Sequence, residues 1–85
     1  MKLFLTKKAH GFLEKLDKTN KNDYDMLKEA IDSIQNDPYG SKKLKGKFKG
    51  FYRVKRRSYR IIFHINKKEK IISVLEIGKR TNVYK

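Results

Sequence analysis

The hydrophobic residues of the chain change their spacing near Gly40, from a helical period to a period of two. Before Gly40, apolar residues recur at intervals of three and four in two groups, which a polar break at residues 18–22 separates. The groups are Ala9, Phe12, Leu13 and Leu16, and then Tyr24, Leu27, Ile31 and Ile34. This pattern predicts two helices that pack as a hairpin.

The residues that flank these helices predict where each begins and ends. Residues 1–6 form a short, mostly apolar segment that ends at Thr6. We therefore expect a first strand here, with Thr6 as the cap of the first helix. For the second helix, Asn22 or Asp23 is the expected N-cap, and residues 37–40, which include a proline and a glycine, are the expected stop.

The second half of the chain has the alternation of β-strands. Residues 41–50 are rich in lysine and predict an exposed loop, and alternation starts at Phe51. Short turns at residues 56–58 and 66–69 predict three antiparallel strands. The positions expected to face the helices are Tyr52, Val54, Tyr59, Ile61, Phe63, Ile65, Leu75 and Ile77.

These elements predict an α+β fold in the order β-α-α-β-β-β, with the helical hairpin on one face of a small, mainly antiparallel sheet. The length of 85 residues predicts a single domain that spans residues 1–85.

The sequence has no cysteine, which excludes a disulfide framework, a thiolate nucleophile and cysteine-bound zinc. It has neither a membrane-length apolar run nor a signal-peptide pattern, so we expect a cytoplasmic protein that does not bind membranes.

Charge is distributed very unevenly between the two halves. The chain carries a formal charge of +14, and seven lysines balance seven acidic residues in residues 1–40. The second half therefore holds the whole excess, including all five arginines and only two acids, Glu69 and Glu76. Arginine binds phosphate through its planar fork, so this half predicts a phosphate-rich or strongly acidic partner.

Alternation places much of this charge on the sheet face opposite the helices. The positions of that parity are Arg53, Lys55, Arg60, His64 and Glu76, with Arg80 on a continuation of the last strand. We expect Glu76 to pair with Arg60 or Arg53. Two interpretations remain open at this point: an anion-binding site, because like charges across a sheet repel, or a solvated face over which long side chains spread.

Cations next to a phosphodiester can also catalyse its cleavage. Attack by the RNA 2′-hydroxyl needs a base, positive charge to stabilise the phosphorane and a donor for the leaving oxygen. A lysine among other cations can have a lowered pKa and act as the base. His10 and His64 lack metal-ligand spacing and there is no glycine-rich phosphate loop, so no metal or other cofactor is expected. His10 is expected on a helix surface, and His64 is a minor candidate for the site.

Short motifs along the whole chain resemble the RelE toxins of the RelE/ParE superfamily. The motifs are Leu44-Lys45-Gly46, Gly50-Phe51-Tyr52-Arg53-Val54-Lys55, Tyr59-Arg60-Ile61-Ile62-Phe63, Val74-Leu75-Glu76-Ile77-Gly78-Lys79-Arg80 and Val83-Tyr84. The resemblance implies the toxin of a type II toxin-antitoxin pair. Such a toxin is a metal-independent, ribosome-dependent endoribonuclease, or mRNA interferase, that cleaves mRNA in the ribosomal A site and stops translation.

The resemblance also implies roles for individual residues. Lys55 would act as general base or electrostatic stabiliser, Arg60 would stabilise the phosphorane, Arg80 would assist the leaving group, and Tyr84 would stack on the substrate. Arg53 occupies a position where the family often has lysine, and it is a poor proton acceptor. RNA binding is expected from Lys42, Lys43, Lys45, Lys47, Lys49, Arg56, Arg57 and Lys79.

The expected partners are an acidic, RelB-like antitoxin, the ribosome and mRNA. A ParE-like toxin that inhibits DNA gyrase without catalysis is the alternative within the superfamily, although such toxins generally lack this lysine, arginine and tyrosine set. A third interpretation, a basic nucleic-acid-binding module, explains the charge but not the order of the motifs.

Overall fold

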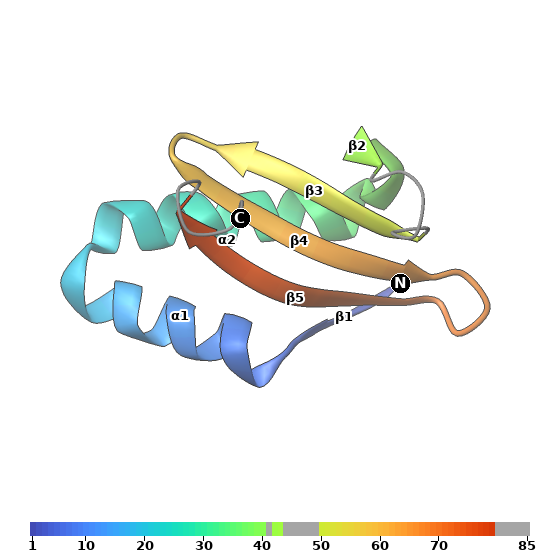
Figure 1. The fold of residues 1–85 in the computed structure, drawn as a ribbon, viewed down its shortest axis with the longest axis horizontal. Coiled ribbons are helices and arrows are strands. Elements are labelled where there is room, and N and C mark those ends of the chain that lie inside the picture. The colour runs from blue at the N-terminus through green and yellow to red at the C-terminus, as the bar shows by residue number, and fades with distance from the viewer. Residues whose placement is uncertain (41, 44–49, 80–85) are drawn as a thin grey trace.

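The computed structural model of the chain describes residues 1–40, 42–43 and 50–79, and it confirms the predicted α+β architecture. Two helices lie behind one twisted sheet, as Figure 1 shows. In chain order the elements are β1 (Lys2–Leu5), α1 (Lys7–Thr19), α2 (Lys21–Asn36), a short 3-10 turn (Pro38–Gly40), β2 (Lys42–Lys43), β3 (Phe51–Arg56), β4 (Tyr59–Asn66) and β5 (Ile71–Lys79).

Thr6 caps α1, as predicted, and also attaches this helix to the sheet. Its hydroxyl oxygen accepts a hydrogen bond from the backbone N–H of Ala9 at 3.2 Å. The same hydroxyl donates to the backbone carbonyl of Leu75 at 2.9 Å. The backbone N–H of Thr6 donates to the backbone carbonyl of Val74 at 3.0 Å. The first turn of α1 is therefore fixed against β5.

The start of α2 was predicted at the wrong residue. Asn20, rather than Asn22 or Asp23, is the N-cap, and its side-chain oxygen accepts from the backbone N–H of Asp23 at 3.2 Å. The backbone N–H of Asn20 also donates to the Leu16 carbonyl at 2.7 Å, so this one residue ends α1 and begins α2. Because Asn20 supplies the cap, the Asp23 carboxylate can reach a partner outside the helix.

The strands form one sheet in the order β1-β5-β4-β3-β2. β1 runs parallel to β5, and the other neighbours are antiparallel. Strand β2 falls within the segment predicted as a loop, where Lys42 pairs with Arg53 and Lys43 pairs with Tyr52. The loop prediction is therefore wrong at these two positions, because lysine side chains do not prevent backbone pairing at a sheet edge.

The core lies between the helices and the inner face of the sheet. The core consists of the apolar residues on the inner side of each helix and of the residues on the inner face of each strand. Most of these residues were predicted. The buried apolar residues are Ala9, Leu13, Leu27, Ala30, Ile31, Ile34, Tyr52, Val54, Tyr59, Ile61, Phe63, Ile65, Ile72, Val74 and Ile77.

A β-bulge explains the one wrong assignment of a core residue. Phe63 pairs with Val74, but Ile62 pairs with Glu76, so Leu75 is an additional residue on β5. Alternation changes phase there: Ile72 and Val74 are buried before the bulge and Ile77 after it. Leu75, predicted to face the helices, is only half-buried and is not part of the core.

Candidate functional site

The outer face of the sheet, which points away from the helices, carries three cross-strand rows of side chains. The strand register defines each row across β3, β4 and β5. The rows are Lys55–Arg60–Gly78, Arg53–Ile62–Glu76 and Phe51–His64–Ser73. We call the first two the cationic rows and the third the aromatic row.

Arg60 occupies the middle of the first row and is 2% exposed. It lies directly opposite Lys55 on β3 and Gly78 on β5. Lys55 is exposed and Arg53, in the next row, is half-buried. The structure thus places these three predicted site residues on one face, with a buried guanidinium beside an exposed amine.

Glu76 does not pair as the sequence suggested. Its carboxylate accepts from the Lys8 amine of α1 at 2.5 Å, and the Glu76 side chain is 34% exposed. β1 ends at Leu5 and pairs with β5 only as far as Val74, so α1 begins beside the remaining edge of β5. This is why Lys8 can reach Glu76, and the expected pair with Arg60 or Arg53 is wrong.

The β3–β4 turn is held against the start of α2 by Asp23. Its two carboxylate oxygens accept from the Tyr59 hydroxyl at 2.7 Å and from the Arg57 guanidinium at 3.2 Å. Burial raises the pKa of Tyr59, and the hydrogen bond to Asp23 raises it further. Arg57 therefore serves a structural contact, and Arg56 donates to the carbonyl of Lys55 at 2.9 Å. RNA binding by Arg56 and Arg57 stays a prediction.

His64 packs against Phe51 in the aromatic row, with ring centroids 4.8 Å apart and the planes inclined by 58°. The Gly50 backbone has a positive φ of 86° and approaches the His64 ring so closely that a Cβ there would lie 3.0 Å from Nε2. Glycine is therefore required at position 50 for two reasons: its backbone has a positive φ, and a side chain there would contact the His64 ring. His10 is exposed on α1, as predicted.

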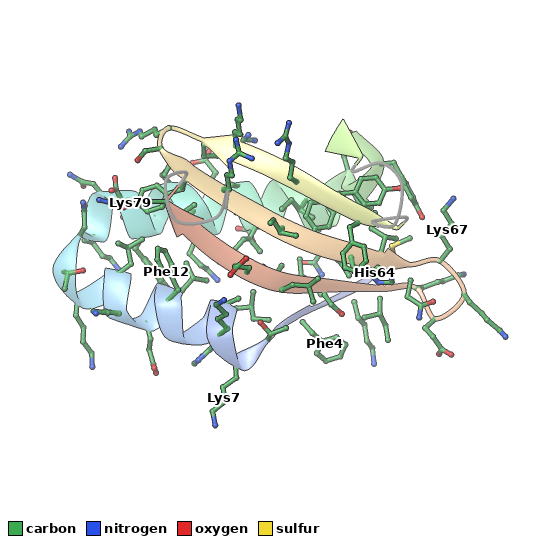
Figure 2. All side chains as sticks on the ribbon, viewed as in Figure 1. Phe4, Lys7, Phe12, His64, Lys67 and Lys79 are labelled. Carbon is green, nitrogen blue, oxygen red and sulfur yellow. The ribbon has the colours of Figure 1, made fainter. Side chains whose placement is uncertain are left out.

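Sequence reasoning included His64 as a minor candidate and missed Phe51. The signal was present, because Phe51 shares its parity with Arg53 and Lys55. Phe4 of β1 extends the same row at its other end, since Phe4 and His64 both pair with Ser73 of β5. Figure 2 labels Phe4 and His64, which lie toward the end of the sheet where β3 begins, and Lys79 at the opposite end.

The remaining predicted site residues lie at the ends of strands or outside the described part of the chain. Lys42 and Lys43 form β2, and Lys79 is exposed at the end of β5. The predicted residues Arg80, Tyr84, Lys45, Lys47 and Lys49 lie outside the described residues.

No grouping of three or more histidine or acidic side chains that could hold a metal ion occurs within residues 1–40, 42–43 and 50–79. In the same part of the chain, none of the helices combines the length and the apolar character that crossing a membrane requires.

A family model described as the ParE toxin of type II toxin-antitoxin systems matches residues 3–84, nearly the whole chain. Comparison with curated protein sequences gives no significant match.

Solved structures of toxins have the same fold. The YoeB/ParE toxin from Agrobacterium tumefaciens superimposes with a TM-score of 0.78 at 17% identity, over 93% of this chain and 98% of that one. The isolated E. coli RelE toxin gives a TM-score of 0.78 at 24% identity, over 98% and 89%. The archaeal RelE–RelB complex from Pyrococcus horikoshii gives 0.75 at 25% identity, over 96% and 97%.

Proposed function

The chain belongs to the ParE toxin family of type II toxin-antitoxin systems, within the RelE/ParE superfamily, and from this premise we propose that it is a ribosome-dependent endoribonuclease that cleaves mRNA. Some superfamily toxins are RNases and ParE-like toxins are not, so membership leaves the activity open. The residues on the outer face of the sheet are therefore what supports a nuclease.

The row of Lys55 and Arg60 supports the nuclease best. Lys55 and Arg60 lie directly opposite each other on two strands, so the register brings two cationic side chains to one place on the outer face, and cations at one place favour the binding of a phosphate. Arg60 is 2% exposed, and buried surroundings strengthen the interaction of its guanidinium with an anion. A phosphodiester is the anion that this pair can both bind and activate.

Each residue has a distinct part in the proposed reaction. Lys55, the exposed amine, accepts the proton of the 2′-hydroxyl or stabilises the developing charge. Arg60 binds the non-bridging oxygens of the phosphorane, and Arg53 in the adjacent row binds a neighbouring phosphate. Arg80 assists the departure of the 5′-oxygen, and Tyr84 stacks on a base of the substrate. The ribosome supplies the A site in which the mRNA is presented.

The toxin would be neutralised by an acidic, RelB-like antitoxin in the cytoplasm. One of the similar folds is described as a RelE–RelB complex, which supports a cognate antitoxin here. The second candidate function is inhibition of DNA gyrase, which the ParE description of the matching family favours.

Lys55→Ala provides the central test, because Lys55 is exposed and its truncation leaves the core unchanged. We expect cleavage of ribosome-bound mRNA to fall by about 100-fold or more, as for loss of a general base. Growth arrest should weaken in parallel. Lys68→Ala, at another exposed lysine, in the β4–β5 turn, is the matched control and should cleave like the unsubstituted chain.

The alternative function gives the opposite result. Growth arrest that persists in the Lys55→Ala variant, with mRNA intact and gyrase supercoiling inhibited, would contradict the nuclease and support the ParE-like activity. RNA without ribosomes should be cut poorly, and efficient cleavage of such RNA would contradict dependence on the ribosome.

A further inference from the structure

We propose that the aromatic row binds an unpaired nucleobase of the RNA by stacking, next to the phosphate-binding cationic rows. The row consists of Phe51, His64 and Ser73, and is continued by Phe4 on β1. This inference deepens the proposed function and rests on its premise that the partner is RNA. It assigns a second part of the same sheet face to a different portion of the nucleotide.

The rings are presented on the correct side of the sheet. Phe51 is on the face opposite buried Tyr52, and His64 is on the face opposite buried Phe63 and Ile65. Both rings are half-buried, so part of each is accessible. Phe4 is 53% exposed, while its neighbours Leu3 and Leu5 pack toward the core.

The His64 ring is held in place by contacts on the outer face of the sheet. Phe51 contacts it at 4.8 Å between centroids. The Gly50 backbone approaches it closely, and the backbone N–H of Ile65 donates to the Gly50 carbonyl at 3.0 Å, which ties the two strands together at this point. A ring that is already immobilised loses little conformational entropy when a base stacks on it.

The charges beside the row favour a nucleic acid as its occupant. Arg53 and Lys55 follow Phe51 on the same face at alternate positions, so Lys55 lies about 13 Å from Phe51 along β3. A short single-stranded segment spans that distance. Glu76, the acidic residue of these rows, is paired with Lys8. Flat rings beside cations on an open sheet form the surface on which single-stranded RNA stacks its bases.

The test compares two oligonucleotides of equal charge. One is a short single-stranded oligonucleotide with a 2′-O-methyl backbone, which lacks the attacking hydroxyl and cannot be cleaved by it. The other has the same backbone without bases. We expect the complete chain to bind the base-containing probe about ten-fold more tightly, because stacking depends on the base and charge does not.

Substitutions in the aromatic row test whether its rings cause the difference in affinity between the two probes. Phe51→Ala and His64→Ala should each weaken binding of the base-containing probe about five- to ten-fold and leave binding of the abasic probe unchanged. Phe51→Tyr keeps a ring and should retain the affinity. Unchanged binding of the abasic probe by the alanine variants excludes misfolding as the cause of their weaker binding to the base-containing probe. Phe4→Ala, at an exposed position, tests the extension of the row to β1.

Two controls separate stacking from charge and from loss of any aromatic residue. Tyr39→Ala removes a ring that is 48% exposed after α2 and contacts Tyr52 on the helix side, and it should bind both probes normally. Lys55→Ala should weaken binding of both probes equally and reduce the salt dependence.

The inference is overturned if the complete chain binds both probes equally, or if the ring variants weaken binding of both to the same extent. It is also overturned if those variants weaken binding of an acidic antitoxin peptide and leave the oligonucleotide affinity intact, since the row would then be a protein-binding surface. A chain that discriminates the base-containing probe but leaves ribosome-bound mRNA intact would contradict the proposed nuclease alone.

Discussion

Tyr59 and Arg60 are adjacent in β4, and both are buried although their side chains lie on opposite faces of the sheet. Tyr59 joins the core and donates its hydroxyl hydrogen bond to Asp23 of α2. Arg60 lies on the outer face, opposite Lys55. The contact of Tyr59 with the helices thus determines the position of the residue next to it.

Tyr59→Phe should lower the free energy of unfolding by about 1–2 kcal/mol at neutral pH, because a partly buried hydrogen bond to a carboxylate is lost. The measurement is urea unfolding. Tyr39→Phe, which removes a hydroxyl from a ring that is 48% exposed, is the control and should leave stability unchanged.

The stabilisation from Tyr59 should also depend on pH. Burial and Asp23 raise the pKa of Tyr59 in the folded chain, so above the ordinary value of about 10 the folded state keeps a proton that the unfolded state loses. The contribution is therefore complete below about pH 10 and is lost as pH rises through the folded pKa. Unfolding curves of the unsubstituted chain and Tyr59→Phe should converge at high pH, and a constant difference would contradict this.

Among the elements, the junction of β1, α1 and β5 sets the edge of the candidate site. β1 pairs with β5 only through Val74, the bulge follows at Leu75, and α1 continues along the edge, where Lys8 reaches Glu76. The sequence predicted the strand, the helix and the Thr6 cap. It did not predict the bulge, because residues 71–77 include apolar residues of both parities and an additional residue leaves no trace in that pattern.

Thr6→Ala should destabilise the chain by about 1–2 kcal/mol, since it removes the helix cap and the hydrogen bond to the Leu75 carbonyl. The midpoint of denaturant unfolding measures this effect. Thr6→Ser keeps the hydroxyl and should recover most of the stability. An alanine variant as stable as the unsubstituted chain would show that other contacts position α1.

At the scale of the whole molecule, the charge of +14 predicts how the chain meets its partners. The first forty residues are neutral, so the field of the protein originates from the second half, which forms most of the sheet. The helices occupy the inner face of this sheet, and Arg53, Lys55 and Arg60 lie on the outer one. An acidic antitoxin is expected to associate with this outer face.

Association with the antitoxin should be strongly salt-dependent. We expect the association rate to fall about ten-fold or more from low to high ionic strength, because screening removes long-range attraction. Stopped-flow mixing of the purified partners measures the rate, after co-purification has identified the acidic chain. An association rate that does not change with salt would contradict an electrostatically guided encounter.

The sequence by itself determined the helices, four of the strands (β1, β3, β4 and β5), the inner parity of β3 and β4, and the confinement of charge to the second half. These are local properties: periodicity, capping and composition act within one element. Tertiary structure alone decided the partner of Glu76, the phase change at Leu75, the burial of Arg60 and the union of Phe51, His64 and Phe4 in one row. Each of these depends on register between strands or on packing across elements, which residues distant in the chain establish only when the sheet assembles.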